Sequence, residues 1–410
     1  MDTGINVDSL LRNVNNKRKI YKDKDEKITS KILEYDFFVR NEIEISNIIK
    51  ENMTFIEKNG SFRFLTVERY NFIEIYNCNQ TYPQFINNFE NLQNFDDKKY
   101  VILEYKNTEN ENNWDKLNYN SLIYFLLNDE NMPLFCNITY FYEYFLKNFS
   151  FLSKMNIRSL NFSSKNLLYS IKEDCIYLKN FEKCCKNDIL SENIENINKF
   201  IKIIEKIDYF GNKHFDLFFI KMIIIKKDLF IILNNLEMLV DEYLNNLYFL
   251  NFFSENTKRE IITFTKNYIK NMKIFQKNDE TVNNIIKENR WKDYLSYYLK
   301  DSNSHSKSTI WEMFSINSFF LNITFCLLKF IEIEDKNSII HKYIKFLVNN
   351  LNIQNSVDIT KNEILYNSFM SSLEEDNNTK YIDSIKNIYI ENVEKYEMVY
   401  NYLLKNIEFF

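Results

Sequence analysis

The spacing of apolar residues predicts several elements in the first quarter of the chain. Residues 36–52 place Phe and Ile at helical spacings with no Gly or Pro between them, which predicts a helix. The runs 62–68 and 71–76 are rich in Phe, Val, Ile, Tyr and Thr and favour strands, and the compact run 99–105 predicts a third strand. A small, strand-bearing N-terminal part is therefore expected.

The pattern changes after residue 106. Apolar positions recur at helical spacing for most of the remaining length, and Pro133 separates a helix predicted over residues 135–154 from what precedes it. The most apolar stretches, 215–225 and 316–331, are short or interrupted by Lys and Asn. A bilayer span needs about 20 nearly uninterrupted apolar residues. We therefore expect buried core helices and no membrane span.

Residues 155–182 alternate short apolar and polar runs. Leu167–Leu168 and Ile176–Tyr177–Leu178 flank a polar turn at residues 172–174, and Asn180–Phe181–Glu182 follows. Two short strands joined by a tight turn predict a hairpin whose flanking polar residues are suited to holding a ligand.

Composition and charge narrow the function classes. The 410 residues are 45% hydrophobic and 17% aromatic, which is enough to form a large folded core. The 52 basic and 57 acidic residues are interspersed and give a net charge of -5, so nothing favours nucleic-acid binding. Only three Gly and no Ala are present while AT-coded residues dominate, and a glycine-rich phosphate loop is unsupported.

Cysteine spacing and the N-terminal pattern point to a reducing compartment. The six Cys show no CxxC spacing and only three His are present, so we expect no metal site and free thiols. Residues 1–20 are polar, predict a flexible arm and lack a signal-peptide pattern. A cytoplasmic location is expected.

The region around the predicted hairpin resembles the catalytic centre of eukaryotic-type protein kinases, which runs His-Arg-Asp, four residues, Asn, then a hairpin and Asp-Phe-Gly. Ser159–Leu160–Asn161 occupies the His-Arg-Asp position, and Asn166 lies five positions after Asn161. Asn180–Phe181–Glu182 occupies the Asp-Phe-Gly position. The resemblance covers residues 25–375 in order.

The upstream segments resemble the nucleotide-binding lobe of the same family. Lys31, eleven residues before Glu42, is the candidate for the strand lysine, and Glu42 or Glu44 for its glutamate partner in a helix. Glu104 lies in the segment that resembles the hinge. The alternatives are that Lys31 is a surface lysine and that both helix glutamates form a solvated face.

Residues 309–315 resemble the buried Trp-Asp-x-Tyr-Ser start of a core helix in kinase-like proteins of giant (nucleocytoplasmic large) DNA viruses. The resemblance implies an α+β, protein-kinase-like fold. It comprises a small antiparallel-sheet N-lobe over residues 21–106 and a mainly helical C-lobe over 107–410, with a helical insertion at about 183–308. If the chain is viral, the location is host cytoplasm or virion.

Two departures from the family pattern concern its chemistry. Asn161 and Asn180 replace the two acidic residues that handle the substrate proton and the magnesium ion. An amide cannot accept a proton at neutral pH and brings no charge to offset Mg²⁺. We therefore expect a catalytically impaired pseudokinase that binds or scaffolds protein partners, with no metal and no cofactor.

Two alternatives remain. The chain could be an active atypical serine/threonine kinase using ATP and Mg²⁺, with Glu182, Glu173 or Asp174 supplying the missing charge. It could instead be an all-helical interaction protein unrelated to kinases, which predicts that residues 99–105 and 167–178 form no strands.

Overall fold

The computed structural model divides the chain into two compact units. The first unit comprises Met1–Leu122 with Lys165–Cys184, and the second Ile123–Ser164 with Cys185–Phe410. The residues that the structure describes are 19–22, 28–54, 63–73, 99–106, 134–163, 166–170, 175–186, 194–207, 213–270, 275, 280–300, 304–328, 339–351 and 358–375. Most of the predicted N-terminal arm lies outside these ranges.

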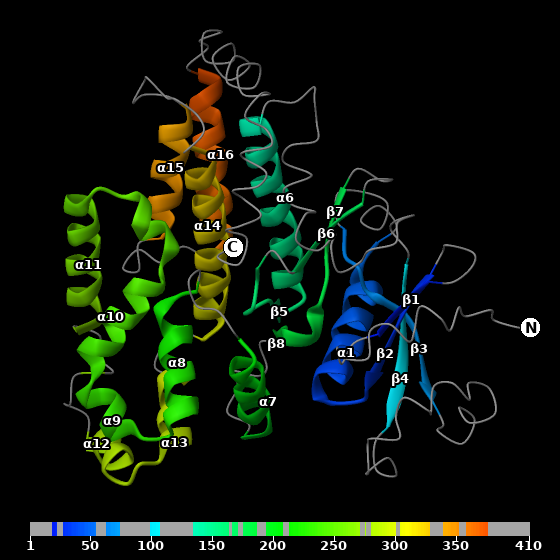
Figure 1. Cartoon of the computed structure of the whole chain (residues 1–410), viewed down its shortest axis with the longest axis horizontal. Coiled ribbons are helices and arrows are strands. Elements are labelled where there is room, and N and C mark those ends of the chain that lie inside the picture. Colours follow the sequence, from blue (N-terminus) through cyan, green and yellow to red (C-terminus); the bar gives the residue numbers. More distant parts are fainter. Residues whose placement is uncertain are drawn as a thin grey trace, which may run out of the picture. The chain divides into compact units, whose positions relative to one another are not determined.

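A four-stranded antiparallel sheet forms the first unit, with α1 (Phe37–Asn52) against it (Figure 1). The strands are β1 (Lys19–Lys22), β2 (Ile28–Glu34), β3 (Val67–Ile73) and β4 (Tyr100–Lys106), in the order β1-β2-β4-β3. Alternate residues Val101, Leu103 and Tyr105 of β4 are buried, whereas Glu104 between them is half-buried. One face of the sheet therefore forms the core beneath α1.

Helix α1 begins and ends where its capping residues satisfy the backbone. Asp36 is the N-cap and its Oδ1 accepts the Val39 N–H at 2.9 Å. The helix ends at Asn52, and the Met53 N–H donates to Ile49 O. The helix predicted over residues 36–52 is confirmed.

The predicted hairpin is also confirmed. It consists of β6 (Leu167–Ser170) and β7 (Cys175–Leu178) and is followed by a 3-10 turn, Phe181–Lys183. Leu178 exchanges backbone hydrogen bonds with Arg63 and Leu65, while Leu168 and Tyr177 join the sheet core. The hairpin thus packs with the first unit, although it lies far along the sequence.

Two strand predictions need correction. Residues 62–68 and 71–76 were predicted as separate strands, but a single strand, β3, spans Val67–Ile73, and residues 62 and 74–76 lie outside the described residues. Phe64 forms only an isolated bridge to Leu178, so residues 63–66 connect to the hairpin instead of to the sheet. The strand predicted at 99–105 is confirmed as β4. Because β4 and the hairpin are strands, the all-helical fold expected under the second alternative is wrong, and the fold is mixed α+β.

Helices dominate the second unit. They are α6 (Leu134–Lys154), α7 (Ile194–Glu205), α8 (Phe215–Lys226), α9 (Leu229–Asn234), α10 (Leu236–Asn246), α11 (Glu255–Lys270), α12 (Glu280–Lys287), α13 (Trp291–Lys300), α14 (Ser304–Leu328), α15 (Ile339–Asn350) and α16 (Ile359–Glu375). Tyr248–Phe252 forms a 3-10 helix, and β5 (Ile157–Arg158) pairs with β8 (Cys185–Lys186).

Helix α14 is the buried centre of this unit and packs against α6, α15 and α16 (Figure 1). The Phe320 ring contacts Phe141 and Tyr142 of α6, and Tyr142 Oη donates to Asn317 Oδ1 at 2.6 Å. The core helix predicted at 215–225 is confirmed by α8, and the one predicted at 316–331 is confirmed by α14 up to Leu328, while residues 329–331 lie outside the described residues. Among the described residues, no helix has the length and apolarity that crossing a membrane requires.

Candidate functional site

Lys31 and Glu42 meet at Tyr105 in the core of the first unit. Lys31 Nζ, from β2, lies 4.5 Å from the centre of the Tyr105 ring. Tyr105 Oη, from β4, donates to Glu42 Oε1 of α1 at 2.8 Å. Lys31 is 9% exposed, Glu42 2% and Tyr105 1%. We call these three residues the phenol cluster, in which one ring contacts a cation through its face and an anion through its hydroxyl.

Sheet register explains why these residues converge. Lys31 is paired with Leu103, which is fully buried on the α1 side of the sheet. Tyr105 lies two residues further along β4 and therefore projects to the same side. Glu104 is paired with Ser30 and projects to the opposite side. The structure thus joins Lys31 to Glu42 through Tyr105, and it leaves Glu104 out of this cluster.

A buried polar stripe on α1 continues the site. Ser46, one helical turn from Glu42, accepts the Val67 N–H at 3.1 Å. Asn41 Nδ2 donates to Glu182 O at 2.9 Å and to Cys184 O at 2.8 Å. Since Glu42 is buried and Glu44 is exposed, Glu42 is the helix glutamate that faces the core, and the solvated-face alternative is wrong for Glu42.

Asn166 and Asn180 lie at the base of the hairpin. The Lys179 N–H donates to Asn166 O at 2.8 Å, and Asn166 Nδ2 is 3.4 Å from Lys179 O. Asn180 follows directly, with φ 62° and ψ 60°, in the left-handed region. Asn and Asp tolerate this region better than other residues with a side chain. Asn41 anchors the segment that follows Asn180, so α1 contributes to both the hairpin base and the phenol cluster.

Asn161 belongs to the second unit, in the half-buried turn after β5. The start of this turn is held by α14, because Glu312 Oε1 accepts the Ser159 N–H. Arg158 Nε donates to Ser308 Oγ at 3.1 Å and lies 3.9 Å from Glu312 Oε2. We call Arg158, Ser308 and Glu312 the α14 cluster.

The Glu312 carboxyl group of the α14 cluster has a raised pKa. Burial raises the pKa of Glu312 to about 7, and Arg158 and the Ser159 N–H only partly oppose this rise. Burial also raises the pKa of the nearby Cys185 thiol to about 12. A thiol with so high a pKa is almost entirely protonated at neutral pH, which disfavours nucleophilic chemistry at Cys185.

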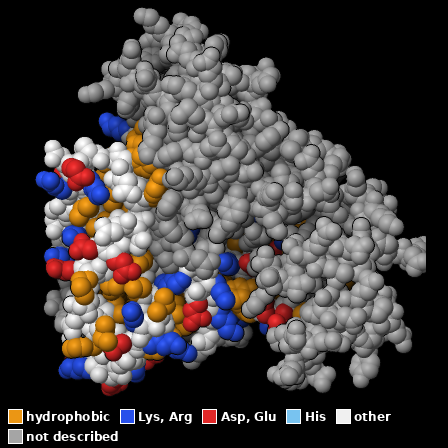
Figure 2. Space-filling model, in the orientation of Figure 1, with side chains coloured by type: hydrophobic (Ala, Val, Ile, Leu, Met, Phe, Trp, Pro, Cys, Tyr) orange, Lys and Arg blue, Asp and Glu red, His pale blue; other side chains and the backbone are white. Residues whose placement is uncertain are grey.

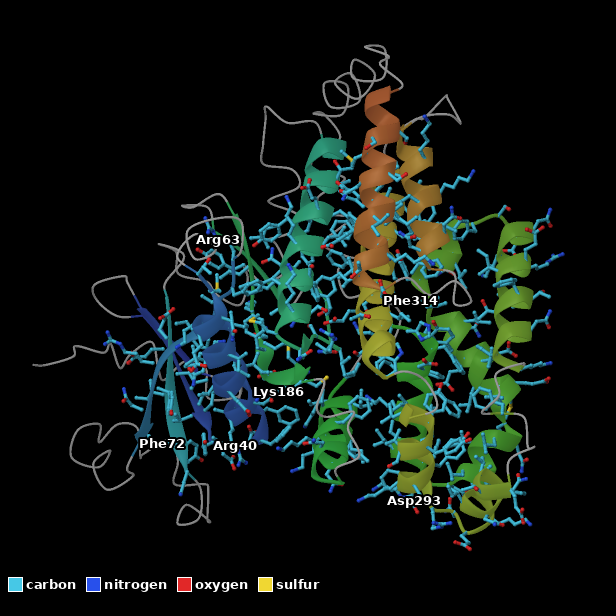
Figure 3. All side chains as sticks on the ribbon, turned by 180° about the vertical axis from the view of Figure 1, so that it is seen from behind. Arg40, Arg63, Phe72, Lys186, Asp293 and Phe314 are labelled. Atoms are coloured by element: carbon cyan, nitrogen blue, oxygen red, sulfur yellow. The ribbon has the colours of Figure 1, made fainter. Side chains whose placement is uncertain are left out.

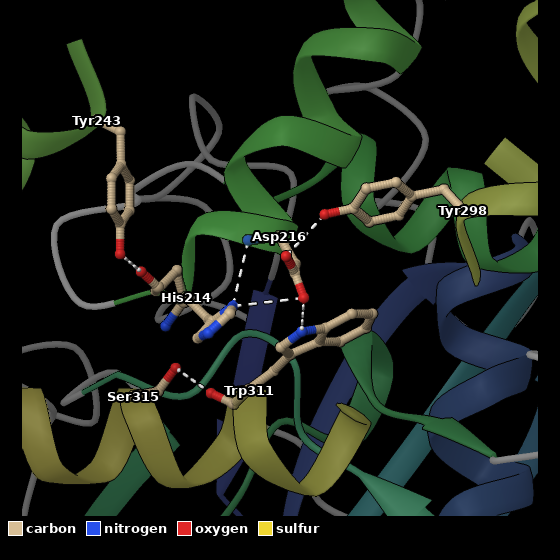
Figure 4. A network of polar contacts seen from close by, with 7 residues as sticks. His214, Asp216, Tyr243, Tyr298, Trp311 and Ser315 are labelled. Carbon is tan, nitrogen blue, oxygen red and sulfur yellow. Dashed lines mark hydrogen bonds and ion pairs between the residues drawn. The ribbon is translucent and has the colours of Figure 1, made fainter. Parts of the chain in front are cut away.

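A second polar network lies at the start of α8 (Figure 4). Asp216 accepts Tyr298 Oη at 2.7 Å and Trp311 Nε1 at 3.1 Å. His214 is the N-cap of α8, and its Nδ1 accepts the Asp216 N–H. His214 is buried. The network connects α8, α13 and α14, and each carboxylate oxygen of Asp216 accepts a hydrogen bond from a neutral donor.

Sequence reasoning missed Tyr105 and Asn41. Tyr105 was part of a predicted strand, and the two-residue alternation with Leu103 could have placed its ring on the core face. Asn41 stands next to Glu42 in a chain where Asn is abundant, so no sequence signal separates it from the others. Within the described ranges, no three His, Cys, Asp or Glu side chains are grouped as metal ligands.

A scan of the chain against models of known protein families found no match, and a search of curated proteins found none either.

Proposed function

We propose that the chain is a protein-kinase-like protein that has lost phosphoryl transfer and functions by binding protein partners. The observation that supports this most strongly is the phenol cluster. A buried lysine on a strand and a buried glutamate on the following helix converge beneath one antiparallel sheet. Active kinases bring a strand lysine and a helix glutamate together as an ion pair, and here each of the two residues contacts the Tyr105 side chain. The motif order at Asn161, Asn166 and Asn180 supports the same family.

The loss of activity follows from the amides. Phosphoryl transfer depends on positioning and on charge stabilisation by magnesium, and the protein supplies the acidic groups that hold the metal and orient the acceptor. Asn161 and Asn180 are neutral at both positions. Asn166 is the single polar residue retained, and its amide is engaged at the hairpin base. Binding is the function that needs none of the missing charges.

Restoring the acids gives a positive test. The variant Asn161→Asp/Asn180→Asp brings back both carboxylates, and Asp tolerates the left-handed backbone at position 180. We expect ATP with Mg²⁺ to raise the melting temperature of this variant and to leave that of the wild type unchanged. The wild type should transfer no phosphate from ATP to a generic acceptor protein. The control Asn234→Asp/Asn245→Asp adds the same charge at exposed positions of α9 and α10 and should behave as the wild type.

Each outcome bears on a different part of the proposal. Phosphate transfer by the wild type would establish the active-kinase alternative. A restored variant that does not respond to ATP and Mg²⁺ would contradict the kinase-like assignment. A response in the exposed-charge control would show that added negative charge, and not its position, produces the effect.

A further inference from the structure

The sheet of the first unit ends in a strand, β3, whose backbone at Val67 and Glu68 is held by Ser46 and Lys50 of α1 and whose remainder the described residues leave uncovered. β3 is the last strand in the order β1-β2-β4-β3 and pairs only with β4 within the sheet. All five residues from 68 to 72 are exposed. An edge strand presents a row of backbone N–H and C=O groups that can pair with another strand, and proteins usually protect it with charge, Pro or a cover.

The exposed edge carries aromatic side chains on the core face. Tyr70 is paired with Leu103 and Phe72 with Val101, and both partners are fully buried. Tyr70 and Phe72 are nevertheless 44% and 51% exposed. The Phe72 ring, labelled in Figure 3, lies edge-on to Tyr35 with the ring centroids 4.9 Å apart. The apolar face of the sheet therefore continues to Phe72. An added strand would extend this face.

The edge is complementary to itself. If two β3 strands pair antiparallel about a twofold axis at Asn71, Tyr70 lies opposite Phe72 of the second copy, and the pair occurs twice. Opposed aromatic residues are among the most favourable cross-strand pairs. Within β3 no two charged residues face each other, since Arg69 lies opposite Ile73, whereas Glu68 lies opposite Glu74, the residue after the strand. A second copy therefore satisfies both the backbone and the aromatic side chains.

We propose that this edge is a homodimer interface in which β3 pairs antiparallel with β3 of a second copy, centred on Asn71. The two sheets then join into one of eight strands. The paired strands are short and bury less surface than a standard interface, so the association is weak and depends on protein concentration. This proposal does not depend on the kinase-like assignment.

Two lysine substitutions in β3 test whether this edge forms the dimer interface. Sedimentation at a series of concentrations should show the wild-type mass rising from 50.0 kDa toward twice that value as the protein concentration increases. Tyr70→Lys/Phe72→Lys places like charges opposite each other and should remain at 50.0 kDa at every concentration. The control Phe230→Lys/Ile231→Lys makes the same change on α9, where the residues are 66% and 52% exposed, and should dimerise as the wild type does. Figure 2 shows apolar side chains of α9–α12 scattered among charged ones.

A cysteine substitution at position 71 tests the register of the β3–β3 pairing, because a disulfide traps the dimer even where its affinity is low. Across the twofold axis the two Cα atoms of residue 71 lie about 4.5 or 5.5 Å apart, within disulfide range. Asn71→Cys should therefore form a cross-linked dimer under mild oxidation. Arg69→Cys should not, because its two copies lie about 13 Å apart along the strands. The wild type, with its native cysteines, controls for other cross-links.

A wild type that stays monomeric throughout the series overturns the proposal, as does a dimer that survives the two edge lysines. A dimer that responds to the lysines but does not cross-link through Asn71→Cys overturns the proposed register. Circular dichroism and melting of each variant separate lost pairing from lost folding.

Discussion

The two units each bury a glutamate on a helix, and they balance its charge in different ways. Glu42 in the first unit accepts a hydrogen bond from the Tyr105 hydroxyl, while Lys31 lies over the face of the same ring. Glu312 in the second unit accepts a backbone N–H and has a cation, Arg158, 3.9 Å away. In the phenol cluster both charged groups contact one neutral ring. In the α14 cluster the charges face each other directly.

This difference determines which residue each cluster depends on most. A buried ion pair contributes little by itself, but removing one partner leaves an uncompensated charge. The α14 cluster should therefore be most sensitive to loss of its cation. In the phenol cluster Tyr105 contacts both other members, so the aromatic residue should matter more than the lysine.

Arg158→Met should cause the largest effect. It removes the cation facing Glu312 and the hydrogen bonds to Ser308 and to Ile157 O. We expect a loss of about 3–5 kcal/mol in the free energy of unfolding at pH 8, measured by denaturant titration. The loss should be smaller at pH 5, where Glu312 is protonated. The control Arg290→Met removes an exposed ion-paired arginine and should cost about 0.5 kcal/mol. Equal losses for both variants would show that Arg158 does not compensate a buried charge.

The raised pKa of Glu312 should make the free energy of unfolding depend on pH. Its folded pKa of about 7 lies above the ordinary value of 4.5, so the folded state holds the proton more tightly. This contribution is fully present below pH 4.5 and is lost as pH rises through 7, amounting to about 3 kcal/mol at most. Unfolding titrations from pH 5 to pH 8 should show a decline that Glu312→Gln flattens. An identical decline in the variant would assign it to other groups.

The sequence predicted elements better than it predicted contacts. The α1 helix, β4 and the hairpin follow from local spacing and composition, because their residues alternate or recur with the period of the element. The strand boundaries within residues 62–76 were predicted wrongly, because aromatic and β-branched residues favour a strand throughout this run. Tertiary pairing with Leu178 instead diverts residues 63–66 toward the hairpin. Local strand propensity does not show that Leu178 competes with the sheet for these residues.

The sequence identified two residues of the candidate site, but not the contacts that they make. Lys31 and Glu42 were identified by their order along the chain, and the structure brings them together. The residue that joins them, Tyr105, carries no motif, and its role depends on β4 lying beside β2 in the sheet. Sheet order is set by long-range packing, which the local pattern does not encode. Glu312 was part of a recognised buried segment, but its contact with Ser159 was not foreseen.

Tyr105→Phe should have an intermediate effect. It keeps the ring beneath Lys31 and removes the hydroxyl that donates to Glu42 Oε1. Loss of a donor to a buried charged group should cost about 1–3 kcal/mol of unfolding free energy, measured by thermal and denaturant unfolding. The matched control Tyr70→Phe removes a hydroxyl from a 44% exposed tyrosine and should be nearly neutral. If Tyr105→Phe is as neutral as Tyr70→Phe, the carboxylate does not depend on the phenol.

Lys31→Met should have the smallest effect of the series. Methionine preserves most of the apolar stem that packs beneath the sheet, so the change chiefly removes the cation 4.5 Å from the Tyr105 ring. A partly desolvated cation–π contact contributes about 0.5–2 kcal/mol. Lys292→Met, which removes an exposed lysine 5.5 Å from the Trp291 ring, should cost less. In a double-mutant cycle with Tyr105→Leu, which removes the ring, the effect of Lys31→Met should shrink, because the cation acts through that ring. Strict additivity would mean that the Tyr105 ring does not contribute to the effect of Lys31→Met.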